Sequence, residues 1–230
     1  MDVLFTDNHL LVVVKPAGVL SQADRTGDDD LLAQGKRYIK QAFSKPGNVF
    51  LGLVHRLDRP VSGVMVFART SKAAGRLSLA FRERAVKKRY IAVVEGKLTG
   101  NGEREDWLVK EQSTVRRVEA SHPKAKRAAL RWRSLGVEDG RSLVEVDLLT
   151  GRPHQVRVQL AALGHPILGD LRYGARNELD GRNLALHAYS LGFEHPVRKE
   201  PMRFATMPPA TWKGFFEQEI RRLVDEDVAG

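Results

Sequence analysis

Asp58 stands between two guanidiniums, those of Arg56 and Arg59, and this pattern could support chemistry. Pro60 and Gly63 follow and predict a turn, and the apolar run after them is typical of a strand. An aspartate on a turn beside a strand can serve as a nucleophile or a base, but most such residues only form ion pairs or complete the turn. The residue types alone leave these interpretations of Asp58 open.

A second group of reactive side chains comprises Arg152, His154 and Arg157, at the predicted start of a helix. Pro153 suits the first helical turn, and Gly164 ends the apolar pattern. The positive end of a helix beside two guanidiniums favours anions such as carboxylates and phosphates. The alternatives are that the arginines pair with local acids and that the histidine is a capping or core residue.

Tyr90 falls near the start of a predicted strand over residues 88–95, in which side chains alternate between two faces. A tyrosine in such a place most often serves packing alone. Its residue type therefore does not mark it as functional.

These segments occur in an order that resembles the RluA-type pseudouridine synthases, which convert particular uridines of ribosomal or transfer RNA into pseudouridine. The matching runs are Lys-Pro-Ala-Gly, His-Arg-Leu-Asp followed by Ser-Gly, Lys-Arg-Tyr-Ile-Ala, Thr-Gly-Arg-x-His-Gln-x-Arg-Val, Gly-His-Pro-Ile-Leu-Gly-Asp and Leu-His-Ala. Together they cover nearly the whole chain. One stretch departs from the family pattern, because Arg59-Pro60-Val61 stands where Lys or Arg, Asp or Glu, and Thr are common.

The resemblance implies that Asp58 is the essential carboxylate and that Tyr90 is a second catalytic residue. Burial alone would raise the pKa of such a carboxylate, so a cation has to keep it ionised. Arg157 is our choice for that cation and Arg152 the second, since arginine keeps its charge when it loses water. The residues expected to contact RNA, of which the first would fill the gap left by the flipped base, are Arg56, Arg152, His154 and Gln155.

The implied reaction breaks the N1–C1′ bond of a uridine, turns the base and joins C5 to C1′. It involves no net redox change and no hydrolysis, so we expect no nucleotide cofactor and no metal. The uridine has to leave its stack before a side chain can reach it. Asp58, Tyr90 and Arg157 should therefore surround one common hollow.

The family fold is α+β, with a bent, mostly antiparallel mixed sheet flanked by helices and an active-site cleft across its middle. We expect a single catalytic domain over residues 1–230, without the N-terminal RNA-binding domain of the S4 type that many members carry. Residues 100–126 are predicted to be a polar excursion between strands. Further predictions from the apolar pattern are strands over 10–14, 127–134, 142–149 and 184–193, helices over 31–43 and 71–86, the second capped by Ser71, and an apolar helical stripe from Trp212 to Leu223.

The composition agrees with an RNA-binding enzyme. The 230 residues carry a net charge of +10, which suggests a polyanionic partner. The absence of cysteine excludes disulfides, thiolate catalysis and cysteine-based zinc sites. No apolar run approaches the ~20 residues that span a bilayer, and the N-terminus lacks the pattern of a signal peptide. We expect a cytoplasmic protein, favour a monomer and expect no membrane partner.

Two other functions compete with this interpretation. A non-catalytic RNA-binding protein on the same fold would keep the basic surface but lose the aspartate, tyrosine and arginine set, which is present here. A kinase-like phosphotransferase is suggested by His-Arg-Leu-Asp alone, and it is disfavoured because the chain has no Gly-rich phosphate loop and no Asp-Phe-Gly.

Overall fold

The structure is a computed structural model that describes residues 1–229. The chain forms two compact units: the first comprises Met1–Lys87 with Ser190–Thr206, and the second comprises Lys88–Tyr189 with the C-terminal residues from Met207. We describe each unit by itself. The prediction of one catalytic domain over the whole chain stays a prediction.

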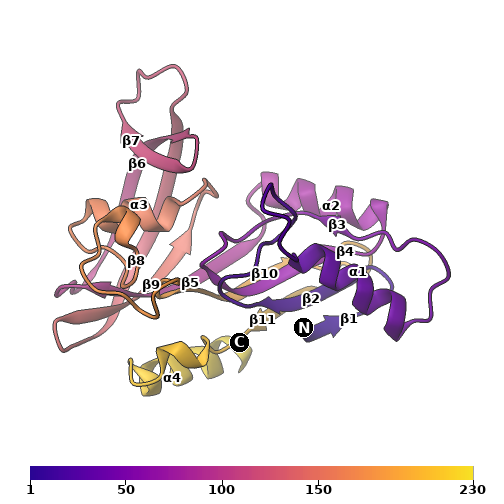
Figure 1. The fold of residues 1–230 in the computed structure, drawn as a ribbon. Coiled ribbons are helices and arrows are strands. Elements are labelled where there is room, and N and C mark those ends of the chain that lie inside the picture. Colours follow the sequence, from indigo (N-terminus) through magenta and orange to yellow (C-terminus); the bar gives the residue numbers. More distant parts are fainter. Residues whose placement is uncertain (230) are drawn as a thin grey trace. The chain divides into compact units, whose positions relative to one another are not determined.

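The first unit is built on buried apolar strands. The run Leu10–Lys15 and the run Ser62–Ala68 are rich in valine, and they pair antiparallel with Val12 opposite Val66. Nearly every residue of both runs is buried, as expected for strands covered on both faces. The strands of this unit are β1 (Asp2–Thr6), β2 (Leu10–Lys15), β3 (Gly52–Leu53), β4 (Ser62–Ala68), β11 (Pro201–Ala205) and the end of β10 (Leu186–Glu194) (Figure 1).

Two helices pack on the first unit's strands. Helix α2 (Ser71–Arg82) joins a core cluster with Leu10 and Val12 of β2, whereas Gly35 of α1 (Leu31–Ala42) lies against Leu11. Successive side chains of a strand point to opposite faces, so α1 and α2 cover opposite faces of β2.

The predicted cap of α2 is wrong by one residue. The hydroxyl of Thr70, not that of Ser71, accepts a hydrogen bond from the backbone N–H of Ala73 at 3.2 Å. The helix also ends at Arg82, before the predicted residue 86, because Arg84 adopts a left-handed conformation with φ 63°.

The second unit corrects the largest error of the sequence-based prediction. Residues 100–126 hold two strands and not a polar excursion, because their charged side chains alternate with more buried ones along an exposed sheet face. The strands of this unit pair antiparallel in the order β5-β9-β8-β6-β7. The strands are β5 (Lys87–Glu95), β6 (Asn101–Glu111), β7 (Thr114–Val118), β8 (Lys126–Glu138) and β9 (Arg141–Leu148).

Helix α3 (Gln155–Ala162) begins two residues later than predicted. Residue His154 has a left-handed backbone with φ 51°, so Pro153 cannot belong to the helix. In Figure 1, α3 lies beside β6 and β8, and the closed end of the β6–β7 hairpin extends past it. A one-turn helix, η1 (Leu171–Tyr173), also contacts α3.

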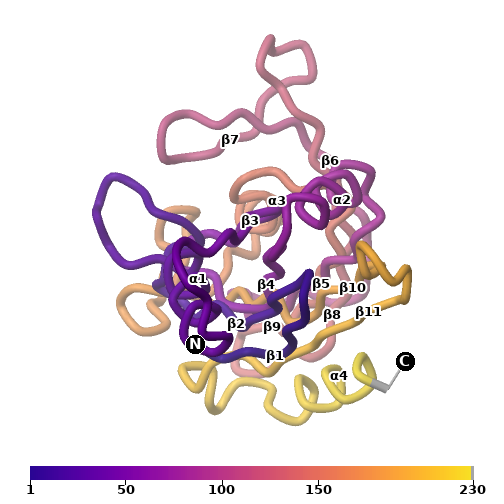
Figure 2. The backbone as a smooth tube through the Cα atoms, turned by 90° about the vertical axis from the view of Figure 1, so that its right-hand side faces the viewer, coloured from indigo at the N-terminus to yellow at the C-terminus, as the bar shows by residue number. Residues whose placement is uncertain are grey.

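The C-terminal helix α4 (Glu217–Ala229) confirms the second half of the predicted apolar stripe, since Ile220 and Leu223 are buried. The first half is wrong, because Phe216 has a left-handed backbone with φ 49° and the helix starts only after it. Asp227 is buried as well, and it pairs with Arg89 of β5 at 2.7 Å. A further one-turn helix, η2 (Ala210–Trp212), precedes α4, which Figure 2 shows near the C-terminus. The α+β class and the mostly antiparallel sheet are thereby confirmed. Over residues 1–229 the structure has no helix of the length and apolarity needed to cross a membrane.

Candidate active site

Asp58 lies half-buried on the loop between β3 and β4, and the residue before it is fixed by Ser21. The buried hydroxyl of Ser21 donates to the carbonyl of Leu57 at 2.7 Å and accepts from the N–H of Leu57 at 3.2 Å. One side chain thus satisfies both backbone groups of the residue that precedes Asp58. No local sequence pattern signals this role, because Ser21 is 36 residues away from Leu57.

The residue after Asp58 is held by Lys15, a fully buried lysine at the end of β2. The ammonium of Lys15 donates to the carbonyls of Arg59 at 3.0 Å and Pro16 at 2.9 Å. The carbonyl of Arg59 also accepts from the N–H of Gly18 at 2.8 Å. The loop is therefore fixed through the backbone on both sides of Asp58.

Lys15 is also electrostatically coupled to Asp58. Burial lowers the pKa of the Lys15 ammonium to about 7, the negative charge of Asp58 acts to raise it, and the positive charge of Arg59 acts to lower it further. Lys15 is thus a cation of the first unit that lies within the field of Asp58. In the sequence Lys15 stands out only as the first residue of the matching Lys-Pro-Ala-Gly run; its place at the end of a buried apolar strand is the signal that could have marked it.

The rest of the Asp58 loop completes this framework. The N–H of Val61 donates to the carbonyl of Asp58 at 3.0 Å, which closes the predicted turn. The ring of His55 stacks on that of Phe81 with centroids 4.6 Å apart, and its Nε2 accepts from the N–H of Val66 at 3.1 Å. This histidine of the motif therefore joins the loop to β4 and α2. Arg56 is exposed, as a residue that contacts RNA has to be.

Tyr90 lies on β5 of the second unit, opposite Val146 of β9, and only 9% of it is exposed. The predicted strand around it is confirmed. Its neighbour Arg89 makes the ion pair with Asp227. The catalytic role of Tyr90 stays a prediction.

Arg157 lies in the first turn of α3 and pairs with an acid of its own unit. Its Nε and Nη2 donate to the two carboxylate oxygens of Asp170, each at 2.7 Å, and both side chains are buried. The guanidinium carbon also lies 5.0 Å from the ring centroid of Tyr173. Local pairing was one of the alternatives for this arginine, and it is present; the pairing of Arg157 with Asp58 stays a prediction.

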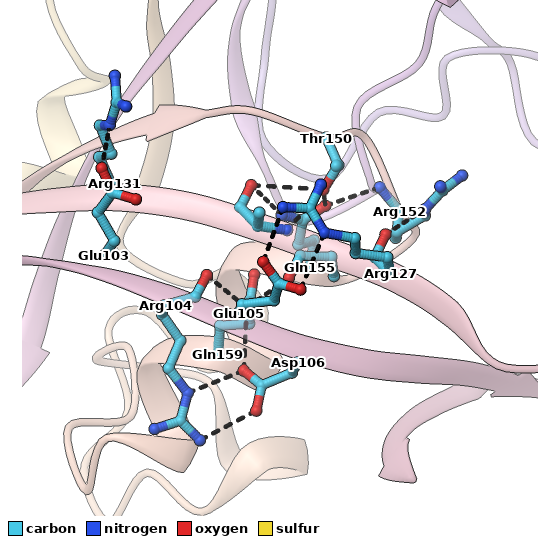
Figure 3. A network of polar contacts seen from close by, with 12 residues as sticks. Glu103, Arg104, Glu105, Asp106, Arg127, Arg131, Thr150, Arg152, Gln155 and Gln159 are labelled. Atoms are coloured by element: carbon cyan, nitrogen blue, oxygen red, sulfur yellow. Dashed lines mark hydrogen bonds and ion pairs between the residues drawn. The ribbon is translucent and has the colours of Figure 1, made fainter. Parts of the chain in front are cut away.

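The other residues of this motif differ in exposure. Arg152 is half-buried, and its Nε donates to the carbonyl of Arg127 at 2.9 Å. The amide of Gln155 is buried, and it binds Thr150 and the carbonyl of Ala129 at 2.7 and 3.0 Å (Figure 3). These contacts of Gln155 are internal, and its predicted RNA contact stays a prediction. His154 is half-buried, and its Nδ1 lies 2.7 Å from the hydroxyl of Tyr173.

The predicted site residues fall into two sets. Asp58 and Arg56 belong to the first unit, and they lie beside Lys15 and Ser21. The second unit contributes the other predicted residues, and it gathers two of them, His154 and Arg157, around Tyr173. The arrangement of one set relative to the other stays a prediction.

Basic side chains are used differently on the second unit's sheet and on helix α2 of the first unit. Arginines on the exposed face of the second unit's sheet form cross-strand ion pairs, such as Arg131 with Glu103 at 2.6 Å and Arg127 with Glu105 at 2.7 Å (Figure 3). Helix α2 and the residues after it carry basic side chains without an ion-pair partner among residues 1–229; they are Lys72, Arg76, Arg82, Arg84 and Lys87. Unpaired cations on a surface are suited to phosphates.

Comparison with known proteins places the chain in a family. The family model described as RNA pseudouridylate synthase matches residues 9–162. The Ribosomal large subunit pseudouridine synthase D of Zymomonas mobilis is 35% identical over 90% of this chain and 69% of its own length. The Dual-specificity RNA pseudouridine synthase RluA of Haemophilus influenzae is 35% identical over 89% of this chain and 91% of its own length.

A solved structure agrees with these relatives. Human RNA Pseudouridylate Synthase Domain Containing 4 is 26% identical, with a TM-score of 0.76 over 96% of this chain and 92% of its own. Several curated relatives are longer, and the chain spans about two thirds of their length. The family match and the relatives at 35% identity show that the chain belongs to the RNA pseudouridine synthases, a family of isomerases that act on RNA.

Proposed function

We propose that this protein converts a particular uridine of ribosomal or transfer RNA into pseudouridine, with Asp58 as the essential carboxylate. One observation carries the assignment of Asp58: the loop is held by hydrogen bonds to the backbone of Leu57 and Arg59. These bonds fix the position of Asp58 and do not involve its carboxylate oxygens. A reactive group that is fixed by its supporting residues is the arrangement that catalysis requires.

Asp58 has to be ionised in each of the routes open to it, which are addition to the base, attack at C1′ and assistance of elimination at C2′. The proposed partner that keeps it charged is Arg157, with the ammonium of Lys15 as a further positive charge in its field. Tyr90 would stack on the flipped base or move a proton from C2′ or C5. Removing the base from its stack costs a few kcal/mol of free energy, which contacts with the enzyme have to offset.

The RNA surface that we propose begins at Arg56, which is exposed two residues before Asp58, and continues along the unpaired basic side chains of α2. The paired arginines of the second unit's sheet are less suited to this role, because a phosphate would have to displace a glutamate from each. Arg152 and His154 would add contacts from the second unit. Shape rather than a long sequence is the usual basis of such recognition in folded RNA.

The choice between ribosomal and transfer RNA rests on relatives alone. One relative is named for the large ribosomal subunit and another for dual specificity, and the chain is equally identical to both at 35%. We therefore propose both RNA classes as candidates. The proposed location is the cytoplasm, and the proposed state is a monomer.

The test is to incubate the purified protein with total RNA from cells that lack its gene, and then to map pseudouridines at single-nucleotide resolution. We expect new pseudouridine at one or a few defined uridines, and none with the Asp58→Asn variant. A protein that binds this RNA with no new pseudouridine at any position would instead be the non-catalytic RNA-binding protein considered above.

A further inference from the structure

The turn after α3 forms a holder for the guanidinium of Arg157. Asp170, which precedes η1, binds two nitrogens of the guanidinium, and Tyr173, the last residue of η1, places its ring 5.0 Å from the guanidinium carbon. The N–H of Tyr173 donates to the carbonyl of Asp170 at 3.0 Å, which fixes these two residues relative to each other. One short turn thus contacts the guanidinium through a carboxylate and through an aromatic ring.

The hydroxyl of Tyr173 connects this holder to two other segments. It accepts a hydrogen bond from the N–H of Val115 on β7 at 2.9 Å, and it lies 2.7 Å from Nδ1 of His154. Its neighbour Arg172 donates to the carbonyl of Ser113 at 2.9 Å. The β6–β7 hairpin, the residue before α3 and the holder of Arg157 therefore meet at one oxygen atom.

The chemistry of the phenol suits this junction. Burial raises the pKa of Tyr173, although the hydrogen bond from Val115 and the charge of Arg157 act against this rise. The phenol therefore keeps its proton and can donate it to Nδ1 of His154 while its oxygen accepts from Val115. The left-handed backbone of His154 is strained for a residue other than glycine, and this hydrogen bond helps to hold it.

We propose that Tyr173 is a positioning residue for the reaction, whose hydroxyl fixes His154 and the first turn of α3 and thereby the guanidinium of Arg157. The proposal rests on the function proposed above, in which Arg157 supports Asp58. A small displacement of a group that acts on the reacting atoms lowers the rate strongly, whereas it changes RNA affinity little, because phosphate contacts elsewhere dominate affinity. The hydroxyl of Tyr173 should therefore affect kcat and not KM.

The test is the variant Tyr173→Phe, which removes the hydroxyl and keeps the ring beside Arg157. We expect kcat for pseudouridine formation to fall about tenfold and KM for the RNA to change less than about threefold. Tyr38→Phe in α1 of the first unit is the matched control, because it removes one phenol hydroxyl from a half-buried tyrosine, and it should keep both constants. Assays are run well below the melting temperature of each variant.

The second variant, Tyr173→Leu, also removes the ring, and it should lower kcat further than Tyr173→Phe does. The proposal would be wrong if Tyr173→Phe kept the wild-type kcat, or if only its KM changed. In either case the activity of the wild-type protein would still support the proposed function. No pseudouridine from the wild-type protein would instead remove the function on which the proposal rests. Nuclear magnetic resonance of the His154 ring adds a direct readout, since its signals should shift in Tyr173→Phe and stay in place in Tyr38→Phe.

Discussion

Asp58 and Asp170 are aspartates of the two units, and they differ in burial and in the bonds that hold the segment around them. Asp170 is buried, and both of its carboxylate oxygens accept from Arg157. Asp58 is half-buried, and the loop around it is held by hydrogen bonds to the backbone of Leu57 and Arg59. The difference teaches that Asp170 is held through its own carboxylate, whereas the loop of Asp58 is held through the backbone on both sides of that residue. A loop fixed in this way can present a reactive side chain at a defined place.

The largest expected effect of this difference is on activity. Asp58→Asn keeps the size of the side chain and the backbone bonds of the loop, so RNA affinity and the free energy of unfolding should change little. Pseudouridine formation should fall by about a thousandfold or more, because the carboxylate itself is lost. Single-turnover assays with a labelled RNA, together with urea unfolding, measure both sides of this expectation. Measurable turnover close to that of the wild type would remove Asp58 from the site.

The corresponding variant, Asp170→Asn, should lower stability as well as activity, because Asp170 binds the guanidinium of Arg157. It leaves the guanidinium of Arg157 buried without its carboxylate, and breaking a buried pair in this way costs about 3–5 kcal/mol. Urea unfolding measures the loss, and Glu103→Gln is the control, because its pair with Arg131 is exposed and should contribute less than about 1 kcal/mol. Equal losses in the two variants would show that burial does not separate these ion pairs.

Lys15, which lies in the field of Asp58, and Arg157, which binds Asp170, also differ in how they titrate: Lys15 can lose its proton near neutral pH, whereas Arg157 cannot. Below a pH of about 7 the Lys15 ammonium is charged in the folded and the unfolded chain. Between about pH 7 and its ordinary pKa of 10.5 only the unfolded chain keeps the proton. The free energy of unfolding should therefore rise with pH across this range, since the unfolded state holds more protons there.

The variant Lys15→Met isolates this contribution. The difference in unfolding free energy between wild type and variant should grow in favour of the wild type from pH 7 to pH 10, by an amount on the order of a few kcal/mol. Asp58 and Arg59 are the charged groups that act on Lys15. Parallel pH profiles of the two proteins would show that Lys15 does not titrate in this range.

Much of this comparison could be predicted from the sequence, and the missing parts have physical reasons. The strand after Asp58, the strand of Tyr90 and the helix of Arg157 all follow from local apolar patterns and turn residues. Ser21 and Lys15 were missed because their partners are distant in the chain, and no local pattern reports such a contact. Asp170 was part of a matching motif, but its pairing with Arg157 depends on the turn that follows α3.

The strands β6 and β7 were missed for a different reason. Their solvent-facing side chains are charged, and a strand with a charged face resembles a loop when apolar residues are sought. The structure shows that those charges are satisfied across the strands, by Arg127 with Glu105 and Arg131 with Glu103. Net charge alone suggests one basic surface. Ion pairing divides the basic residues of the described chain into those that a glutamate already neutralises and those, as on α2, that have no ion-pair partner.

The smallest expected effects concern these two kinds of basic residue. The double variant Lys72→Gln with Arg82→Gln removes two unpaired charges from α2, and it should weaken RNA binding about tenfold at moderate salt. The magnitude of the slope of log affinity against log salt should fall by about one to two, because each phosphate contact that is removed no longer releases counterions on binding. Filter binding across a salt series measures both quantities.

The matched control, Arg127→Gln with Arg131→Gln, removes the same number of positive charges from the paired face. It should change affinity and slope little, because each arginine already neutralises a glutamate and would have to give up that partner to bind a phosphate. If net charge alone attracted the RNA, the two double variants would weaken binding equally. A larger loss of affinity from the sheet variant than from the α2 variant would place the RNA surface on the second unit. Arg127 and Arg131 would then have to exchange their glutamate partners for phosphates when RNA binds.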